Sequence, residues 1–369
     1  MYLTTIAQQN IINQTYTDAV NKHKLLPIKV TPFFQRKIDK EVKFLGHTCG
    51  PLHRIAYPSH DRLNIKDAKE RADFVNDAFN MQNTLTGIAI QKYQDRIIFF
   101  TTNECIAHCQ YCFRQSFLAD KQAQNKTNIL NKLEKFITYL KATQKITEVI
   151  LSGGEPMLLS MPELATIFTE IKKVPNIKHI RLHTKALTYA PELFTVEKLK
   201  LFKQFSVRLV FHIVHPYEIC TKVKRTIKRI KKFTIKCYNQ FPLIRNINDH
   251  HEVIIKLLEE LDELGVRNLS IFYPDAVNYS VNFRISFSRI FKLIDQINFN
   301  TPSWINALKF TLDTAIGKVQ RENLLNLDKE KNIALFERDG KIIEYPDLDS
   351  KFDQPGDIKI LLWRNLDSE

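Results

Sequence analysis

The sequence contains no long apolar run. No stretch among its 369 residues approaches the about 18 consecutive apolar residues that cross a bilayer, and residues 1–10 lack the charged and apolar regions of a signal peptide. Cysteine is scarce, with six residues, and Cys49, Cys220 and Cys237 lack the paired spacing of a disulfide framework. These absences argue against a membrane-spanning protein and against a disulfide-stabilised secreted one. We therefore expect a cytoplasmic protein.

The other three cysteines lie close together, in residues 102–117, which read Thr-Asn-Glu-Cys-Ile-Ala-His-Cys-Gln-Tyr-Cys-Phe-Arg-Gln-Ser-Phe. The thiolates of Cys105, Cys109 and Cys112, at C-x3-C-x2-C spacing, can each bind one iron of a 4Fe–4S cluster and leave the fourth iron open. A structural zinc site with His108 as fourth ligand is an alternative, but such sites usually bring a second ligand pair, which is missing. A redox C-x-x-C motif would leave Cys105 unexplained.

The net charge of +14 raises the possibility of nucleic-acid binding. Much of the excess lies in residues 222–236, where apolar residues recur at helical spacing. This pattern indicates the solvated face of a helix that leads into a strand, and no aromatic residues alternate with the charges to stack bases. We therefore expect no nucleic-acid partner, although an RNA-binding metalloprotein without enzymatic activity remains a distant alternative.

Hydrophobic periodicity divides the chain into three regions. Residues 1–94 are predicted to be mainly helical and irregular, and residues 301–369 to form a C-terminal extension. Between them, in residues 95–300, short apolar runs alternate with amphipathic helices, which predicts an α/β fold, a partial (β/α)6 barrel of the TIM type. In such barrels the chemistry lies at the C-terminal ends of the strands. The expected strands are residues 96–101, 148–152, 179–183, 207–212, 233–238 and 268–273, and the clearest helices are residues 125–143, 161–173 and 249–264.

A glycine pair and a glutamate, Gly153, Gly154 and Glu155, follow the second expected strand. Glycines let the backbone approach a ligand closely, and Glu155 can accept a hydrogen bond from an ammonium group. Alone, these residues would indicate a tight turn. Together with the cysteine motif, they resemble the radical S-adenosylmethionine (radical SAM) enzymes, in which the open iron binds the amino and carboxyl groups of S-adenosylmethionine. The resemblance implies that Tyr111, Gly153, Gly154 and Glu155 bind this cofactor.

Longer segments resemble the lysine 2,3-aminomutases, radical SAM enzymes that also use pyridoxal 5′-phosphate. Residues 92–96 read K-Y-Q-D-R where the family has R-Y-P-D-R, and residues 113–117 read F-R-Q-S-F where it has T-R-R-R-F. Residues 212–219 (H-I-V-H-P-Y-E-I) resemble H-F-N-H-P-N-E-I, and residues 239–249 (N-Q-F-P-L-I-R-N-I-N-D) resemble N-Q-S-V-L-L-R-G-V-N-D. The resemblance extends over residues 26–347.

Two aspartates bear on the substrate. Asp275, at the end of the last expected strand, and Asp313 match the family's pair of carboxylates that holds the side-chain ammonium group of lysine. Two carboxylates around one ammonium group offset the cost of removing it from water. Outside this resemblance, Asp275 would be assigned to a turn and Asp313 to the surface. Arg114 matches the arginine that pairs with the substrate carboxylate.

Several basic residues are implied to bind pyridoxal phosphate. Lys318 matches the lysine that forms the Schiff base with the cofactor, although the family's glycine-rich segment before it is shortened here. Arg96 and Lys92 are expected to hold the phosphate, and Lys92 replaces an arginine, which keeps the charge but loses the bidentate fork. Gln240 is placed near the cofactor by its motif. Lys185 stands where the family has arginine, and its role is left open.

The resemblance implies that the protein interconverts L-lysine and β-lysine by a radical 1,2-amino shift, with a flavodoxin or ferredoxin as reductant. Alternatives are the branch of the family associated with elongation factor P, and an aminomutase for arginine or another basic amino acid. The elongation factor P branch ends soon after the cofactor lysine, whereas this chain continues through residues 334–346. No cysteine follows Cys237, so we expect the zinc-binding end of the longer enzymes to be absent. A homo-oligomer is possible.

Overall fold

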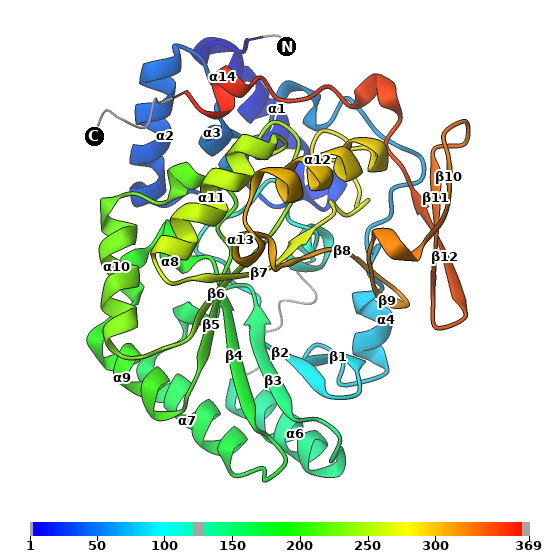
Figure 1. Ribbon diagram of the computed structural model, residues 1–369. Helices are drawn as coiled ribbons and strands as arrows, with labels where there is room; N and C mark the ends of the chain where they lie inside the picture. The colour runs from blue at the N-terminus through cyan, green and yellow to red at the C-terminus, as the bar shows by residue number, and fades with distance from the viewer. Residues whose placement is uncertain (1–2, 121–128, 364–369) are drawn as a thin grey trace.

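The protein is built on one large sheet that curves into a partial barrel, with helices on its outside (Figure 1). The computed structural model describes residues 3–120 and 129–363. The large sheet has nine strands in the order β1 to β9, so every strand pairs with its neighbour in sequence. Its strands are β1 (Ala89–Tyr93), β2 (Arg96–Thr102), β3 (Glu148–Gly153), β4 (His179–Thr184), β5 (Arg208–Phe211), β6 (Cys237–Pro242), β7 (Arg267–Phe272), β8 (Lys309–Thr314) and β9 (Gly317–Val319).

Strands β2 to β8 are parallel, whereas β1 and β9 pair antiparallel at the two ends of the sheet. Parallel neighbours place the C-terminal ends of all these strands at one edge, where the loops after them converge. The predicted α/β architecture, a partial barrel of the TIM type, is therefore confirmed.

Each barrel helix buries one apolar face against the sheet. In α7 the buried residues Leu164, Ile167, Phe168 and Ile171 recur at the spacing that lines one side of a helix, and Ser160 caps its start. The α-helices are α1 (Ile6–His23), α2 (Pro32–Leu45), α3 (Pro51–Ala56), α4 (Asp77–Gln82), α5 (Gln115–Ala119), α6 (Ile129–Ala142), α7 (Met161–Lys172), α8 (Ala186–Tyr189), α9 (Val196–Gln204), α10 (Thr221–Lys232), α11 (His251–Glu263), α12 (Phe287–Asn300), α13 (Ser303–Asn306) and α14 (Ile358–Leu361).

The strand pattern differs from the predicted one at the start of β6 and before β2. The fifth predicted strand, residues 233–238, begins too early, because Phe233 ends α10 and Thr234 turns the chain with a φ of 58°. In addition, β1 lies in a region predicted to be mainly helical and irregular, and it forms a hairpin with β2. Of the predicted helix at residues 125–143, residues 125–128 lie outside the described part of the chain.

The C-terminal region contributes to the barrel itself. Strand β8 pairs with β7 and adds a parallel strand to the six predicted from the sequence. A separate three-stranded antiparallel sheet follows, formed by β10 (Leu324–Asp328), β11 (Ile333–Arg338) and β12 (Lys341–Pro346). Asp313 therefore lies in a barrel strand, next to the site at its interior, rather than in an appended segment.

The N-terminal helices pack over one end of the barrel, together with α14 (Figure 1). Lys37 of α2 donates a hydrogen bond to the carbonyl of Glu218, 2.7 Å away, and Thr31 donates one to the carbonyl of Tyr189. The ring of Trp363, just after α14, lies 4.6 Å from that of Phe44 in α2. Among the described residues, no helix has both the length and the apolar composition needed to cross a bilayer.

Candidate active site

One cavity of about 1030 Å³ runs through the barrel. It is lined by every residue that the sequence singles out for cofactor or substrate binding, although these come from segments far apart in the chain. They are Lys92, Arg96, Cys105, Cys109, Tyr111, Cys112, Arg114, Gly153, Gly154, Glu155, Gln240, Asp275, Asp313 and Lys318. The folded chain thus brings the cysteine loop, the acidic pair and the lysine into a single enclosure.

The cysteine loop follows β2 and is fastened to the N-terminal region by its backbone. Lys29 donates from its ammonium group to the carbonyl of Cys105, and the amide of His108 donates to the carbonyl of Lys29 at 2.9 Å. The imidazole Nδ1 of His108 lies 2.7 Å from the carbonyl oxygen of Pro27. One ring nitrogen of His108 is therefore engaged by the backbone.

The three thiols fit the donor set of an iron–sulfur cluster. Burial and the neighbouring Cys109 raise the pKa of Cys112 to about 12, and burial likewise raises the pKa of Cys105, with the other two thiols contributing. Crowded, buried thiols of this kind keep their protons until a metal ion replaces them. Three such groups on one loop can hold three irons of a 4Fe–4S cluster and leave one iron facing the cavity.

The glycine pair locks the loop after β3 against the cysteine loop. The Gly154 amide donates to the carbonyl of Thr102 at 2.6 Å, and the Glu155 amide donates to the carbonyl of Glu104 at 2.7 Å. Gly153 has a φ of 119°, which a side chain would strain. A Cβ atom on Gly154 would lie 2.0 Å from the carbonyl oxygen of Glu104. The glycines are thus required for contact between two backbones as well as for lining the cavity.

We expect Gly154→Ala to displace the cysteine loop. The added methyl group cannot fit 2.0 Å from a backbone oxygen, so the loop must shift at a cost of about 1–3 kcal/mol or more. The iron content after anaerobic reconstitution and the melting temperature should both fall. Gly340→Ala is the control, because its Cβ would meet no atom within 4 Å and only its φ of 74° is strained. Equal iron content in both variants would contradict this interpretation.

The carboxylate of Glu155 is surrounded by protein donors. It accepts hydrogen bonds from the hydroxyl of Thr184 at 2.7 Å and from the amides of Lys185, Ala186 and Met157. Burial raises its pKa, while these donors act in the opposite direction. In the structure, Glu155 therefore joins the ends of β3 and β4, and binding of a cofactor ammonium group by its side chain stays a prediction.

An aspartate without a sequence motif organises the basic residues of the site. Asp77, the first residue of α4, lies 3.1 Å from the ammonium group of Lys92 and 2.9 Å from Nε of Arg114. Lys92 is also 3.9 Å from Asp313 and donates to the carbonyl of Val75 at 2.7 Å. The nearby arginine and lysine hold the pKa of Asp77 below its usual value, against the effect of burial.

One of the two predicted substrate carboxyl groups affects the protonation of the other. Burial and the nearby Asp313 raise the pKa of Asp275 to about 8. Oδ1 of Asp313 is buried and has no hydrogen-bond partner among the described residues. Two close carboxylates, one of them incompletely hydrogen-bonded, favour the binding of a cation between them.

Lys318 lies directly across the sheet from Asp313. The shortened segment before it forms the β8–β9 hairpin, in which Asp313 pairs with Lys318 and Gly317 adopts a φ of 103°. The ammonium group of Lys318 is 4.6 Å from the centre of the Phe272 ring, and its backbone amide donates to the hydroxyl of Tyr93 at 3.2 Å. Burial lowers the pKa of Lys318. The hairpin therefore directs this lysine into the cavity despite the missing glycines.

Three basic side chains lie near enough to Lys318 to affect its protonation. Arg181 of β4 pairs with Glu148 at 2.7 Å, but its Nε is buried and has no partner in the described part of the chain. Arg96 pairs with Asp95, and Lys309 begins β8. The positive charges of Arg181, Arg96 and Lys309 oppose protonation of Lys318. These residues form a region that favours an anion.

His183 and Gln240 meet near the middle of the barrel. Nδ1 of His183 is 3.3 Å from Nε2 of Gln240, and His183 Nε2 is buried without a partner in the described residues. Sequence analysis singled out Gln240 but missed His183, Arg181 and Asp77. Positions 181 and 183 are two residues apart in β4, so their side chains face the same side of the sheet. This spacing of polar residues in a predicted strand could have identified them. No comparable pattern indicated Asp77.

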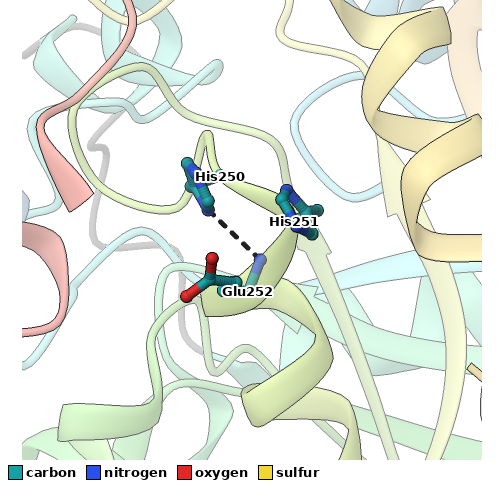
Figure 2. A group of neighbouring side chains, drawn as sticks. All are labelled: His250, His251 and Glu252. Carbon is teal, nitrogen blue, oxygen red and sulfur yellow. Dashed lines mark hydrogen bonds between the residues drawn. The ribbon is translucent and has the colours of Figure 1, made fainter. Parts of the chain in front are cut away.

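A second group of possible metal ligands lies at the start of α11. His250, His251 and Glu252 place their ligand atoms within 4.8 Å of one another (Figure 2). His250 caps the helix, because its Nδ1 accepts the amide of Glu252 at 3.3 Å. One of its ring nitrogens therefore already has a structural role, and we assign no metal to this group.

Comparison with known proteins agrees with the barrel and its cysteine loop. Residues 99–274, which include the cysteine loop and the strands from β3 to β7, match the radical SAM superfamily. Several relatives are L-lysine 2,3-aminomutases, and another is a glutamate 2,3-aminomutase. The chain is related to the lysine 2,3-aminomutases. It is a radical SAM protein related to the aminomutases, which are isomerases.

The sequence identity between this chain and these relatives is modest. A Treponema pallidum relative is 30% identical over 205 residues, which are 55% of this chain and 57% of that protein. The L-lysine 2,3-aminomutase of Escherichia coli is 26% identical, over 71% of this chain and 73% of that protein. The glutamate 2,3-aminomutase of Clostridioides difficile is 25% identical, over 70% of this chain and 58% of that protein. A solved structure described as native anSMEcpe with bound AdoMet and Kp18Cys peptide has a TM-score of 0.43 and 14% identity, over 73% of this chain and 80% of that chain.

Proposed function

We propose that this protein is a radical SAM and pyridoxal phosphate-dependent aminomutase that interconverts L-lysine and β-lysine by a 1,2-amino shift. The observation that carries the proposal is the position of Lys318 across from Asp313, in the cavity that also contains Asp275 and the three cysteines. A cluster site, a partly buried lysine and a carboxylate pair in one enclosure match the needs of this reaction. The cluster with S-adenosylmethionine would supply the radical that removes hydrogen, and pyridoxal phosphate the carbonyl that holds the migrating nitrogen.

The charge of the cavity supports a basic side chain on the substrate. An ammonium group placed between Asp275 and Asp313 would give the free Oδ1 of Asp313 a partner and would favour ionisation of Asp275. The same carboxylates would repel the side chain of glutamate. Lysine is the simplest substrate that meets these conditions, and arginine is the alternative that a competition assay must exclude.

Arg114 is proposed to bind the carboxylate of the substrate. Its Nε is taken by Asp77, and its guanidinium group packs 4.5 Å from the ring of Phe113 and 5.2 Å from that of Phe100. These contacts fix the plane of the guanidinium group. Its other N–H groups can then form the bidentate pair that a carboxylate prefers.

The phosphate of the cofactor is proposed to lie among Arg96, Arg181 and Lys309 rather than beside Lys92. Lys92 is already paired with Asp77, which leaves it little capacity to neutralise a phosphate. Arg181 has a buried Nε without a partner in the described residues, and an anion would provide one. This arrangement would keep the phosphate near Lys318, while His183 and Gln240 would lie beside the ring of the cofactor.

The binding of L-lysine is expected to strengthen as the pH rises from 6 to about 8. In the ligand-free protein, Asp275 keeps its proton up to about pH 8, and binding an ammonium group requires its loss. The affinity should therefore rise by up to about tenfold per pH unit in this range. Isothermal titration of protein without pyridoxal phosphate, in buffers of different ionisation enthalpy, would measure both the affinity and the released proton. An affinity that stays constant from pH 6 to 8 would contradict the assignment of Asp275.

The reaction itself can be tested with anaerobically reconstituted protein. We would supply pyridoxal phosphate, S-adenosylmethionine, dithionite and L-lysine, and detect β-lysine by mass spectrometry after derivatisation. Formation of β-lysine, with L-arginine and L-glutamate giving no product, supports the proposal. Formation of 5′-deoxyadenosine without β-lysine would still support radical SAM chemistry but would exclude lysine as the substrate. In the cell, we propose that a flavodoxin or ferredoxin takes the place of dithionite.

A further inference from the structure

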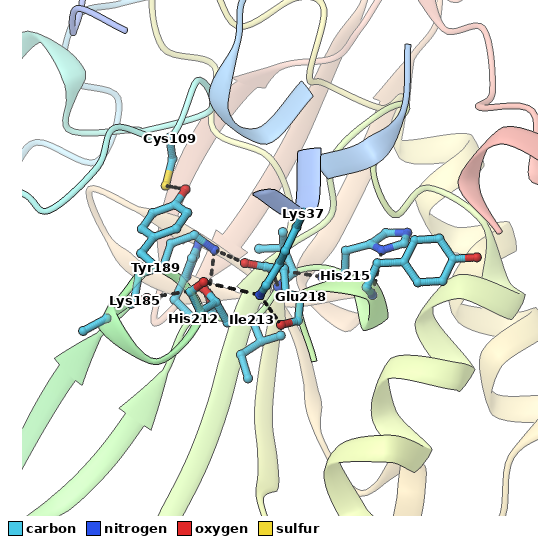
Figure 3. A network of polar contacts seen from close by, with 12 residues as sticks. Lys37, Cys109, Lys185, Tyr189, His212, Ile213, His215 and Glu218 are labelled. Carbon is cyan, nitrogen blue, oxygen red and sulfur yellow. Dashed lines mark hydrogen bonds and ion pairs between the residues drawn. The ribbon is translucent and has the colours of Figure 1, made fainter. Parts of the chain in front are cut away.

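A tyrosine outside the recognised motifs contacts one of the three cysteines of the site. The hydroxyl oxygen of Tyr189 lies 3.2 Å from Sγ of Cys109 (Figure 3). Tyr189 is the last residue of α8, the short helix after β4, and only 2% of it is exposed. The contact therefore joins the cysteine loop to a different part of the barrel.

The direction of this hydrogen bond follows from the chemistry of a metal ligand. A cysteine that binds iron does so as a thiolate and has no proton to donate. The hydroxyl of tyrosine can donate, and at neutral pH it keeps its proton. In the metal-bound protein, Tyr189 must therefore be the donor and Cys109 the acceptor.

The surroundings hold the ring of Tyr189 in place. The ring of Phe34 meets it edge to face, with 4.7 Å between centres, and the ammonium group of Lys185 lies 5.0 Å from its centre. The backbone carbonyl of Tyr189 accepts a hydrogen bond from Thr31 at 2.6 Å. Contacts on two sides of the ring and on the backbone leave the hydroxyl one position, against the sulfur.

Lys185 is itself fixed by a buried network (Figure 3). Its ammonium group lies 2.8 Å from the carboxylate of Glu218, which is fully buried, and donates to the carbonyl of His212 at 2.9 Å. Lys37 of α2 donates to the carbonyl of Glu218 at 2.7 Å. The network links α2, the end of β4 and the loop after β5 to Tyr189. The position of Tyr189 therefore depends on contacts between these three segments.

We propose that Tyr189 donates a hydrogen bond to the sulfur of Cys109 and thereby raises the reduction potential of the cluster held at this site. Reduction adds negative charge to the cluster and its sulfurs. A donor aimed at a sulfur stabilises the reduced form more than the oxidised form, and such bonds are among the factors that set these potentials. Tyr189 is thus a positioning residue that acts through Cys109. The inference rests on the proposed function only in requiring that the cysteines hold a cluster.

Replacement by phenylalanine removes the hydroxyl and keeps the ring contacts. For reconstituted Tyr189→Phe, we expect the equilibrium constant for one-electron reduction of the cluster to fall about tenfold, which lowers the potential by about 59 mV. A redox titration followed by electron paramagnetic resonance measures this shift. Tyr57→Phe is the control, because the Tyr57 hydroxyl donates to Gln35 at 2.7 Å and not to a cysteine. The cluster potential of this variant should equal that of the unmodified protein.

The possible outcomes separate this inference from the proposed function. If the unmodified protein assembles no 4Fe–4S cluster, the proposed function and this inference both fail. If Tyr189→Phe assembles the cluster at an unchanged potential, the inference alone is wrong. Should Tyr189→Phe lose the cluster, 3,5-difluorotyrosine at position 189 gives an independent test, because it retains the hydroxyl and makes it a stronger donor. The potential must then rise, and an unchanged potential overturns the inference.

Discussion

Asp275→Asn is expected to weaken the binding of L-lysine by about 100-fold. The change preserves the size of the side chain but removes one of the two charges that would surround the substrate ammonium group. Loss of one partner from a buried, hydrogen-bonded ion pair costs about 2–5 kcal/mol, and about 3 kcal/mol corresponds to a factor of more than 100 in affinity. The KM for L-lysine should rise, whereas cluster content and binding of S-adenosylmethionine should be unchanged.

The matched control for this variant is Asp295→Asn. Asp295 pairs with Arg321 at 2.6 Å on the surface, where its side chain is 61% exposed. Surface ion pairs of this kind contribute little to the stability of the fold. Its KM should equal that of the unmodified protein. If Asp275→Asn also bound lysine normally, the carboxylate pair would not be the site of the substrate ammonium group. The proposal of a cationic substrate would then lose its main evidence.

Lys318→Ala is expected to reduce the rate of β-lysine formation by about 10⁴-fold or more, the scale seen when a group that bonds covalently to the reacting system is removed. The visible absorbance of a Schiff base with pyridoxal phosphate should be lost as well, which separates a chemical role from a structural one. The three thiols lie on a different loop, so the iron content should stay normal.

The control for Lys318 is Lys341→Ala, at the exposed start of β12. It changes the same residue type in the same C-terminal region and should keep both absorbance and activity. If Lys318→Ala retained the absorbance, another lysine would hold the cofactor, and the family's glycine-rich segment would have to be matched to different residues of this chain.

The three-dimensional arrangement explains how the shortened segment before Lys318 can still work. Two strands joined by a tight hairpin need few residues, and pairing of Asp313 with Lys318 fixes both on the same face of the sheet. Arg338 of β11 donates to the carbonyl of Lys318 and supports the hairpin from behind. The glycines missing from this chain are thus replaced by a hairpin with one glycine, Gly317, at the position that requires a φ of 103°.

The local features of this protein could be predicted from its sequence. The cysteine spacing, the glycine pair and the alternation of apolar runs with amphipathic helices depend on residues a few positions apart, so they indicated the cluster loop and the partial barrel. The boundaries of the strands could not all be predicted. The start of β6 depends on the positive φ of Thr234, and amino-acid composition does not indicate such a backbone angle at a threonine. β1 was missed because it is a short strand paired only at the edge of the sheet.

The sequence alone determined the cysteine loop, the glycine pair and the basic and acidic groups recognised by their motifs, and the tertiary structure decided which further residues join them and which of them meet. Nothing in the order of residues links Asp77 to Arg114 and Lys92, or Tyr189 to Cys109, because each pair is brought together by separate strands and loops. The physical reason is that ion pairs and hydrogen bonds depend on distances of about 3 Å. Such distances between remote segments are set only when the barrel closes around its core.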